Sequence, residues 1–268
     1  GNFSGGGFNS QEHLAPCAVD IAPDLRFKPA TRVENACASG SAAIAAAKNA
    51  IEAGEAELAL VIGVEKMTTL NTAGVTGVLA MASYWPEEGA QGMTFPGLFA
   101  EYAKGYSARH GLSADDLRVM LAKVTAKNHT NALANPLAQM PWECTYEDIL
   151  TRPAEKNPVV APPLRLFDCS LVSDGAAAIV LASEKKAKEI KEELVELAAL
   201  VHTTDYLPIS KRSNSEFVAG KKAIQKAYEL ANITVDDLDF AEVHDCFTIA
   251  EVLAYEALSL VPDGKGAQ

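Results

Sequence analysis

The sequence predicts an α/β fold with a largely parallel sheet. The first observation is that strand-like runs alternate with helical runs over much of the chain, which is the order that βαβ units produce. The second is that 49% of the residues are hydrophobic and 22% are charged, the balance of a globular domain rather than of a disordered segment. The third is the length of 268 residues, which is enough for one large domain or two small ones.

The first strand–helix–strand unit lies near the N-terminus. Residues 31–35 form a short β-type run, and residues 57–64 form an apolar run that predicts a buried strand. Between them, residues 39–53 are helical in composition, and Gly54 is suited to the C-terminal cap. The connection from the first run to the helix passes through Cys37.

The alternation stops between residues 67 and 166, where helices and loops are expected instead. Ser113, followed by Asp115 and Asp116, predicts a helix start with an acidic first turn. Apolar residues then recur at helical spacing, namely Leu117, Met120, Leu121 and Val124. Six prolines interrupt the following stretch, at positions 136, 141, 153, 158, 162 and 163. A long connection of this kind predicts an insertion packed over a core domain.

Residues 175–183 resume the strand pattern after the insertion, and a second α/β unit follows them. In that unit the patterns predict, in order, a strand over residues 195–201, a helix over 220–232 and a strand over 239–243. After the last strand, Thr248 and Glu251 have capping-box spacing and predict a helix that runs to about Leu260. Each half of the chain thus has a strand-to-helix turn with a cysteine, Cys37 in one and Cys246 in the other, which suggests two similar halves.

Composition excludes several classes of protein. The formal net charge is −12, with 23 Lys and Arg against 35 Asp and Glu, whereas nucleic-acid binders need a basic surface. Residues 67–86 lack charge but contain Thr, Asn, Ser, Gly and Pro, so we expect no membrane span there. The first residues show no secretory signal, and the five cysteines have no paired spacing. We therefore expect a cytoplasmic protein without disulfides, structural zinc or another metal site.

Cys37 is the first candidate catalytic residue. It precedes a helix whose first turns consist almost entirely of small residues, so that helix is expected to be buried. At a helix start, unpaired backbone N–H groups and the positive end of the helix dipole stabilise a thiolate, and they can also stabilise an oxyanion. The pattern therefore predicts a nucleophile that attacks a thioester carbonyl. An inert core cysteine fits the composition equally well.

His244 and Cys246 are the second group of candidate catalytic residues. Residues two apart in an extended segment point to the same side, so the imidazole and the thiol are expected to share one wall of a cavity, with Asp245 pointing away. Such a pair can move a proton or polarise a carbonyl near neutral pH. A chance pairing is the alternative, and two ligands are too few for a metal site. The sequence has no glycine-rich loop of the kind that binds nucleotide phosphates.

Three segments resemble the thiolase superfamily, in the order in which that family has them. VENACASGSAA around Cys37 resembles its C-x-S nucleophile motif, and SDGAAAIVLAS from Ser173 resembles the return from its loop domain to the core. EVHDCF from Glu242 resembles the motif of sterol-carrier-protein-type thiolases, a branch similar to acetyl-CoA acetyltransferases. Residues 135–141 and 204–213 are also similar to that branch. The resemblance spans essentially the whole chain.

The resemblance implies a thiolase fold, an αβαβα layered sandwich of two similar βαβαβαββ halves with an inserted helical loop domain. In these terms residues 1–66 are the first part of the N-terminal half, 67–166 the loop domain, 167–192 the return to the N-terminal half, and 193–268 an incomplete C-terminal half. The first strand and helix of the family's N-terminal half have no counterpart in the sequence.

The resemblance also implies an acyltransferase of lipid metabolism, which catalyses reversible thiolysis of a 3-ketoacyl-CoA or Claisen condensation of acyl-CoA. Cys37 would carry the acyl group, and its backbone N–H would help to form one oxyanion hole. His244 stands where other thiolases have an Asn that orients a water in the second oxyanion hole. Cys246 stands where this branch has its acid/base thiol. The coenzyme A thioester is the substrate, no cofactor is bound covalently, and the residues that contact coenzyme A are not identified.

One departure from the family concerns the end of the chain. Family members continue past Ala267 into a Gly-His-Pro motif whose His activates the nucleophile, and the 268 residues lack that motif. We expect this His in the remainder of a longer polypeptide, because the loss of core strands would leave sheet edges unpaired. The same departure motivates an alternative, a non-catalytic acyl-CoA-binding thiolase-like protein or a partner-dependent subunit. A ketosynthase-like condensing enzyme is a further alternative.

The family resemblance also bears on partners. It implies a homodimer or a homotetramer, and it makes a small zinc-ribbon/OB-fold protein that handles acyl-CoA a candidate partner. The composition predicts neither a nucleic acid nor a membrane as a partner.

Overall fold

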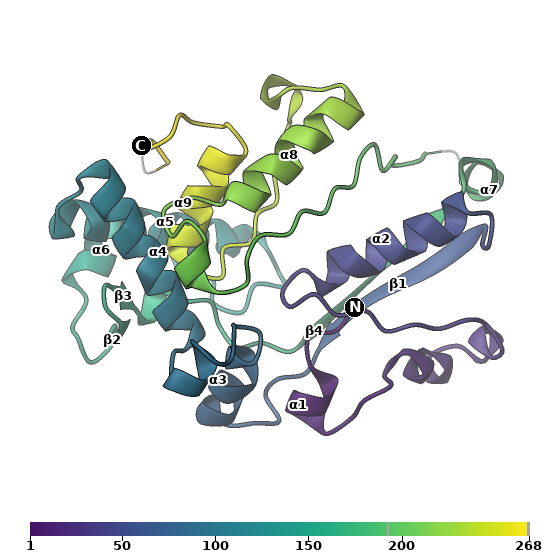
Figure 1. Cartoon of the computed structure of the whole chain (residues 1–268), viewed down its shortest axis with the longest axis horizontal. Coiled ribbons are helices and arrows are strands. Elements are labelled where there is room, and N and C mark those ends of the chain that lie inside the picture. The colour runs from purple at the N-terminus through teal and green to yellow at the C-terminus, as the bar shows by residue number, and fades with distance from the viewer. Residues whose placement is uncertain (192, 267–268) are drawn as a thin grey trace. The chain divides into compact units, whose positions relative to one another are not determined.

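The computed structural model describes residues 1–191 and 193–266, which form two compact units (Figure 1). Unit 1 consists of Gly1–Ala82 and Val172–Leu197, and unit 2 consists of Ser83–Leu171 and Ala198–Gln268. Residue 192 and residues 267–268, which end the predicted return segment and the predicted C-terminal half, lie outside the described residues. The two units divide the chain at positions other than the domain boundaries that the family resemblance implies, and those boundaries stay a prediction.

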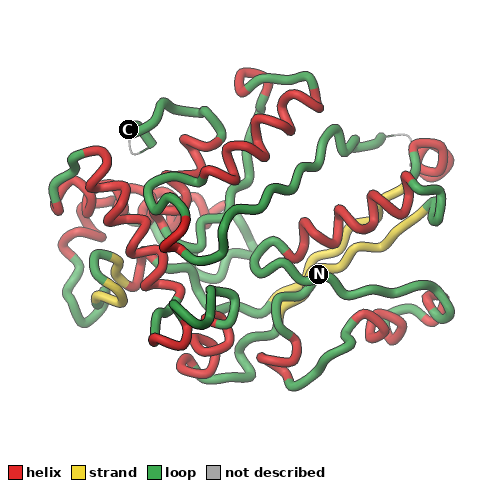
Figure 2. Tube along the Cα trace, in the orientation of Figure 1, coloured by secondary structure: helices red, strands yellow, loops and turns green. Residues whose placement is uncertain are grey.

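Unit 1 is built around an antiparallel strand pair. β1 (Leu58–Glu65) and β4 (Gly175–Ala182) pair over their whole length, which confirms strands at 57–64 and 175–183. The prediction that the first of them is buried is wrong, because within β1 only Val61 is buried. Apart from Glu65, both strands consist of Val, Ile, Leu, Ala and Gly, which suit a sheet packed against a helix. That helix is α2 (Ser39–Glu52), which lies along the strand pair (Figures 1 and 2). The remaining helices of the unit are α1 (Gly5–Asn9), α3 (Thr72–Ala80) and α7 (Glu184–Ile190).

Residues 1 and 2 lie beside β1. Gly1 N donates to Ile62 O at 2.7 Å, and Gly1 O accepts from Val64 N at 3.3 Å, which is the hydrogen-bond pattern of a parallel pair. Asn2 N donates in turn to Val33 O at 3.3 Å. Val33 is therefore linked to β1 through the first two residues of the chain.

The prediction of a largely parallel sheet is wrong for the described residues. Both ladders within residues 1–191 and 193–266 are antiparallel, β1 with β4 and β2 (Val159–Ala161) with β3 (Leu164–Arg165). Three predicted strands, over 31–35, 195–201 and 239–243, are not part of either ladder. A strand exists only where the backbone groups of a neighbour are in register with it, and these three segments meet no such neighbour in the part of the chain that the structure describes.

Unit 2 is mainly helical. Its helices are α4 (Phe95–His110), α5 (Ala114–Asn131), α6 (Tyr146–Thr151), α8 (Val218–Ala231) and α9 (Thr248–Ala257). α8 confirms the helix predicted over 220–232. One hydrophobic core lies between α4, α5 and α9, and it includes the fully buried Tyr106, Leu121 and Ile249. The core thus fixes the position of α9 and of the residues that lead into it.

The two helices that frame this core begin differently. At α5, Ser113 Oγ accepts from Asp116 N at 3.1 Å and Asp116 Oδ2 accepts from Ser113 N at 3.3 Å, which confirms the predicted helix start. At α9, the predicted capping box of Thr248 and Glu251 is wrong. Phe247 is the N-cap residue there, and the helix has no side-chain cap. Glu251 is instead hydrogen-bonded to α5.

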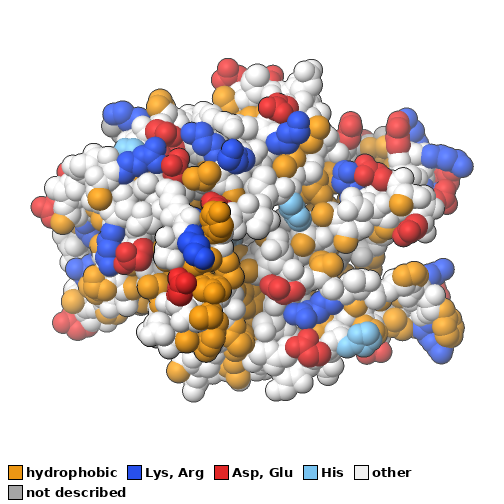
Figure 3. All heavy atoms as spheres, viewed as in Figure 1, with side chains coloured by type: hydrophobic (Ala, Val, Ile, Leu, Met, Phe, Trp, Pro, Cys, Tyr) orange, Lys and Arg blue, Asp and Glu red, His pale blue; other side chains and the backbone are white. Residues whose placement is uncertain are grey.

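The surface carries charges of both signs. On the face shown in Figure 3, basic and acidic side chains are interspersed. This distribution and the net charge of −12 provide no extended basic stripe on that face for a nucleic acid. None of the described helices combines the length and the apolar composition that crossing a membrane requires.

Candidate active site

Cys37 lies in unit 1, on the turn that precedes α2. Ser39, the first residue of α2 and only 4% exposed, holds this turn through its hydroxyl group. Its Oγ accepts a hydrogen bond from Asn35 N at 2.9 Å and donates one to Ala36 O at 2.7 Å. Ala38 N also donates to Asn35 O at 2.9 Å. The chain therefore turns tightly around Cys37, which confirms its predicted place before a helix. The predicted burial of that helix is wrong, because Ser39 is the only buried residue of α2.

Ala36 has a left-handed backbone conformation, with a φ of 47°. Such a conformation costs a residue with a Cβ atom roughly 1–2 kcal/mol, so it persists only where the surroundings determine it. Here the Glu34 carboxylate accepts from Ala36 N, while Ala36 O accepts from Ser39. Cys37 is thus presented by a strained turn whose conformation is fixed on both sides.

The surroundings of Cys37 do not favour the thiolate. Partial loss of water around the sulfur raises the pKa of the Cys37 thiol, the backbone N–H of Cys37 lowers it, and the Glu65 carboxylate at the end of β1 raises it again. The residue keeps an exposed surface, so this desolvation is incomplete. The backbone N–H at the helix start thus favours the thiolate, as predicted, but the loss of water outweighs this effect on the pKa of Cys37.

His244 and Cys246 lie in unit 2, on the segment that leads into α9. His244 is exposed, whereas Cys246 is half-buried against the hydrophobic core. Cys246 O accepts a hydrogen bond from Ser170 N at 2.9 Å, which ties the segment to the chain that follows β3. The structure thus brings these two candidates together on one segment and leaves the third, Cys37, in unit 1.

Cys169 is a further cysteine beside this segment, to which the sequence assigns no role. It forms an isolated antiparallel bridge with Phe247, whose ring stacks on Phe99 at a centroid distance of 4.4 Å. Its Sγ donates to Arg165 O at 3.3 Å. Burial, reinforced by the Asp168 carboxylate, raises the pKa of Cys169 to about 12. Cys169 is therefore a protonated, structural thiol rather than a second nucleophile.

A network of polar side chains links the His244–Cys246 segment to α5. Asn128 Nδ2 donates to Asp245 Oδ2 at 2.7 Å and to Glu251 Oε2 at 2.6 Å. Glu251 is only 2% exposed, and it also accepts from Lys127 Nζ and from the Tyr255 hydroxyl. Burial lowers the pKa of Lys127, but its bonds with Glu251 and Tyr255 outweigh that effect and raise it. The Lys127 ammonium therefore stays charged and compensates Glu251.

Asp168 supports the first turn of α9. Its carboxylate is 1% exposed, lies 2.7 Å from Arg118 Nη1, and accepts from Arg165 N at 2.8 Å and from Thr248 Oγ1 at 3.5 Å. Burial raises the pKa of Asp168, and the Arg118 guanidinium opposes this. Sequence reasoning missed Asp168 and Asn128, because their partners meet only once α5 packs on α9. No local sequence pattern marks either residue.

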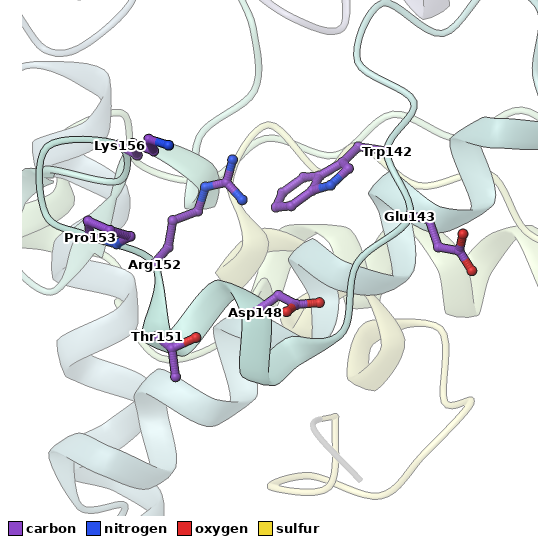
Figure 4. Close-up of a pocket in the computed structure, with 7 residues that line it drawn as sticks. All are labelled: Trp142, Glu143, Asp148, Thr151, Arg152, Pro153 and Lys156. Atoms are coloured by element: carbon purple, nitrogen blue, oxygen red, sulfur yellow. The ribbon is translucent and has the colours of Figure 1, made fainter.

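Two cavities in unit 2 lie apart from the three candidate residues Cys37, His244 and Cys246. One, of about 440 Å³, is lined by Trp142, Glu143, Asp148, Thr151, Arg152, Pro153 and Lys156 (Figure 4). There the Arg152 guanidinium lies 4.1 Å from the centre of the Trp142 ring, so the arginine closes one side of the cavity by stacking. The other cavity, of about 270 Å³, lies against α5. Neither is lined by Cys37, His244 or Cys246.

The candidate residues offer the chemistry of two thiols and an imidazole. Within residues 1–191 and 193–266, no group of three or more His, Cys, Asp or Glu is arranged to hold a metal ion. A thiol on a strained turn suits nucleophilic attack on a carbonyl, and a second thiol suits proton transfer. These roles belong to acyl transfer.

Comparison with known proteins gives the family. A model of the thiolase N-terminal domain matches residues 17–185, and a model described as thiolase C-terminal domain-like matches residues 202–268. The acetyl-CoA acetyltransferase of Methanocaldococcus jannaschii is 39% identical over 271 residues. The alignment covers 100% of this chain and 66% of that relative, so the chain spans about two thirds of the relative's length.

Two solved structures have a similar fold. The Ltp2-ChsH2(DUF35) aldolase matches with a TM-score of 0.65 and 20% identity, over 85% of this chain and 58% of that one. A monomeric SCP2-thiolase like protein type 1 from Mycobacterium smegmatis matches with a TM-score of 0.63 and 21% identity, over 85% of this chain and 48% of that one. These matches confirm the predicted thiolase fold. The N-terminal domain model alone matches more than half of the residues of this chain, and the chain therefore belongs to the thiolase family.

Proposed function

We propose that the protein is an acyl-CoA C-acyltransferase that catalyses reversible thiolysis of a 3-ketoacyl-CoA or Claisen condensation of acyl-CoA. The observation that carries this proposal is Cys37 on its strained turn before α2, inside the region that matches the thiolase N-terminal domain. The 39% identity to an acetyl-CoA acetyltransferase supports the same activity. The substrate is a coenzyme A thioester, and the reaction needs no covalently bound cofactor.

In the thiolysis direction, the Cys37 sulfur attacks the C3 carbonyl of a 3-ketoacyl-CoA while its proton passes to a base. The C2–C3 bond then breaks, the electron pair goes to C2, and the Cys246 thiol protonates that carbon to release acetyl-CoA. Coenzyme A next gives its thiol proton to the Cys246 thiolate and attacks the acyl-Cys37 thioester. The shortened acyl-CoA leaves, and Cys37 recovers its proton from the base.

His244 has a supporting role in this proposal. Its exposed imidazole lies on the same segment as Cys246, two residues away. It orients a water that hydrogen-bonds to the thioester oxygen, where negative charge develops when the C2 carbanion forms. The Cys37 backbone N–H serves the oxyanion of the acyl-transfer step in the same way.

The proposed active form is a homodimer or a homotetramer in the cytoplasm, with a role in lipid metabolism. A small zinc-ribbon/OB-fold protein is the proposed partner that handles acyl-CoA. The structural neighbour whose name includes a DUF35 component supports such a partner, and its identity to this chain is 20%.

Intact-protein mass spectrometry with acetyl-CoA tests the proposed function. The purified protein should gain one acetyl-sized increment, and peptide mapping should place it on Cys37. Cys37→Ala should lose the increment and lower thiolysis by at least about a thousandfold, because no other group replaces the nucleophile. The matched control is Cys17→Ala, since Cys17 is another exposed cysteine of unit 1, and this variant should keep both the adduct and the activity.

The same experiment can contradict the proposal. A wild-type protein that stays unmodified, or a Cys37→Ala variant that still turns over, would show that Cys37 is not the nucleophile. An adduct that maps to Cys246 instead would reverse the two cysteine roles.

A further inference from the structure

Asn128 holds two carboxylates with one amide group. Its Nδ2 lies 2.7 Å from Asp245 Oδ2 and 2.6 Å from Glu251 Oε2, so the two hydrogens of the amide go to two different acceptors. Glu251 has two further donors, Lys127 and Tyr255. For the Asp245 side chain, by contrast, the bond from Asn128 is the contact that joins it to α5.

Asp245 stands between the two candidate residues of its segment. Because His244 and Cys246 are its direct neighbours in the chain, a bond that holds the Asp245 side chain also restrains the backbone that carries both of them. The Cys246 backbone is held separately by Ser170 N at 2.9 Å. The segment is thus held at Cys246 through its backbone and at Asp245 through its side chain.

We infer that Asn128 is a positioning residue, which orients the His244–Cys246 segment through Asp245 so that the Cys246 thiol can exchange protons with the substrate. The inference rests on the proposed function of Cys246. The bond through which Asn128 acts on the segment is the one to Asp245.

An asparagine suits this place for an electrostatic reason. Asp245 and Glu251 are both acidic, and the residue at position 128 of α5 lies within hydrogen-bond distance of both carboxylates. An aspartate here would add a third carboxylate and supply no donor, whereas the Asn128 amide supplies two donors without charge. Lys127 already provides the positive charge that Glu251 needs.

Alkylation of Cys246 by iodoacetamide, followed by peptide mapping, tests the inference without requiring turnover. Asn128→Ala and Asp245→Ala should each change the alkylation rate of Cys246 by at least about threefold, because each variant removes the hydrogen bond that joins residue 245 to α5. If both act through one bond, the double variant should react like either single variant. The matched control is Asn131→Ala, since Asn131 is an exposed asparagine at the end of the same helix.

The kinetics provide a second measurement. Asn128→Ala should lower kcat for thiolysis at least about tenfold, with little change in KM, because a small misplacement of the proton donor slows the carbon–carbon step. Alkylation of Cys37 by iodoacetamide should proceed at the wild-type rate, since Cys37 lies in unit 1 and this reaction does not use Cys246. A merely structural role would change kcat and the alkylation of Cys37 together.

The outcomes separate the inference from the proposed function. If Cys37 is acetylated in the wild type and Asn128→Ala matches Asn131→Ala in both Cys246 alkylation and kcat, the inference is wrong and the proposed function stands. If the wild type shows no acetylation of Cys37, the proposed function fails, and the alkylation rates still decide whether Asn128 orients the segment. Additive effects in the double variant would also overturn the inference.

Discussion

Asp174 joins the end of β1 to the start of β4. Its carboxylate lies 2.7 Å from Lys66 Nζ and accepts from Met67 N at 2.8 Å, Thr68 N at 3.0 Å and Thr68 Oγ1 at 2.5 Å. These donors favour the charged form and hold the pKa of Asp174 well below its usual range. Asp174, the aspartate of the SDG segment that resembles the thiolase family, thus stabilises unit 1 by joining the segment after β1 to the start of β4.

Asp174→Asn tests this role through the pH dependence of stability. A carboxyl group whose pKa is lower in the folded state adds stability above its unfolded pKa of about 3.9, and this stability disappears as the pH falls toward the folded pKa. The variant should therefore melt at a lower temperature than the wild type at pH 7, and the difference should shrink between pH 4 and pH 2. Thermal unfolding followed by circular dichroism at several pH values measures it.

Asp20→Asn is the control for this comparison, because Asp20 is an exposed acid of the same unit. Its melting temperature should follow that of the wild type at every pH. An Asp174→Asn protein as stable as the wild type at pH 7, or a difference that is as large at pH 2 as at pH 7, would contradict this structural role of Asp174.

The sequence predicted the candidate site in part. The small residues after Cys37 placed it correctly on a turn before a helix, because local composition determines such a turn, whereas the catalytic roles of Cys37, His244 and Cys246 stay predictions. The sequence indicated the backbone N–H that lowers the pKa of the Cys37 thiol, but not the loss of water and the Glu65 carboxylate that raise it, because both depend on tertiary packing. Asn128 could not be predicted, since its acceptors come from a distant segment.

At the scale of single elements, the apolar runs predicted where two strands lie but not that these strands run antiparallel to each other. Residues 57–64 and 175–183 are strands because their side chains suit a sheet, whatever the partner. Their antiparallel pairing depends on the end from which the chain returns after unit 2, which no local pattern encodes. The runs over 195–201 and 239–243 have similar composition but no ladder in the described residues, since composition does not supply a partner.

The N-terminus of α5 was predictable because the capping signal is entirely local. Ser113→Ala should lower the free energy of unfolding by about 1 kcal/mol, because it leaves Asp116 N without its acceptor. Ser113→Thr keeps a hydroxyl group and should stay within about 0.5 kcal/mol of the wild type. Urea denaturation of both variants measures the difference. Equal losses for Ala and Thr would show that the cap contributes nothing.

At the scale of the whole molecule, the strand pair of unit 1 leaves apolar side chains uncovered. Leu58 and Leu60 of β1 are 43% and 46% exposed, and Ile179 and Val180 of β4 are 44% and 65% exposed. A two-stranded pair of this kind is rarely stable without further cover, and uncovered apolar surface often marks an interface. This observation supports the proposed self-association.

Light scattering coupled to gel filtration tests the proposed oligomer. The expected mass is two or four times the chain mass of 28.4 kDa, and it should persist on dilution to low micromolar concentration. Val180→Lys places a charge on the most exposed of these strand residues and serves as a companion variant. A wild-type mass of one chain at all concentrations would contradict the homodimer and the homotetramer.

The pairing of β1 with β4 has a consequence for synthesis on the ribosome. Glu65 at the end of β1 pairs with Gly175 at the start of β4, and all of Ser83–Leu171, which belongs to unit 2, is translated between them. At translation rates of about 5–20 residues per second, β1 waits on the order of ten seconds for its partner. During that time the edge of β1 that pairs with β4 has no partner, while the local contacts of α4 and α5 can already form. Nascent chains of this protein should therefore depend on chaperones most strongly after β1 has emerged and before β4 follows it.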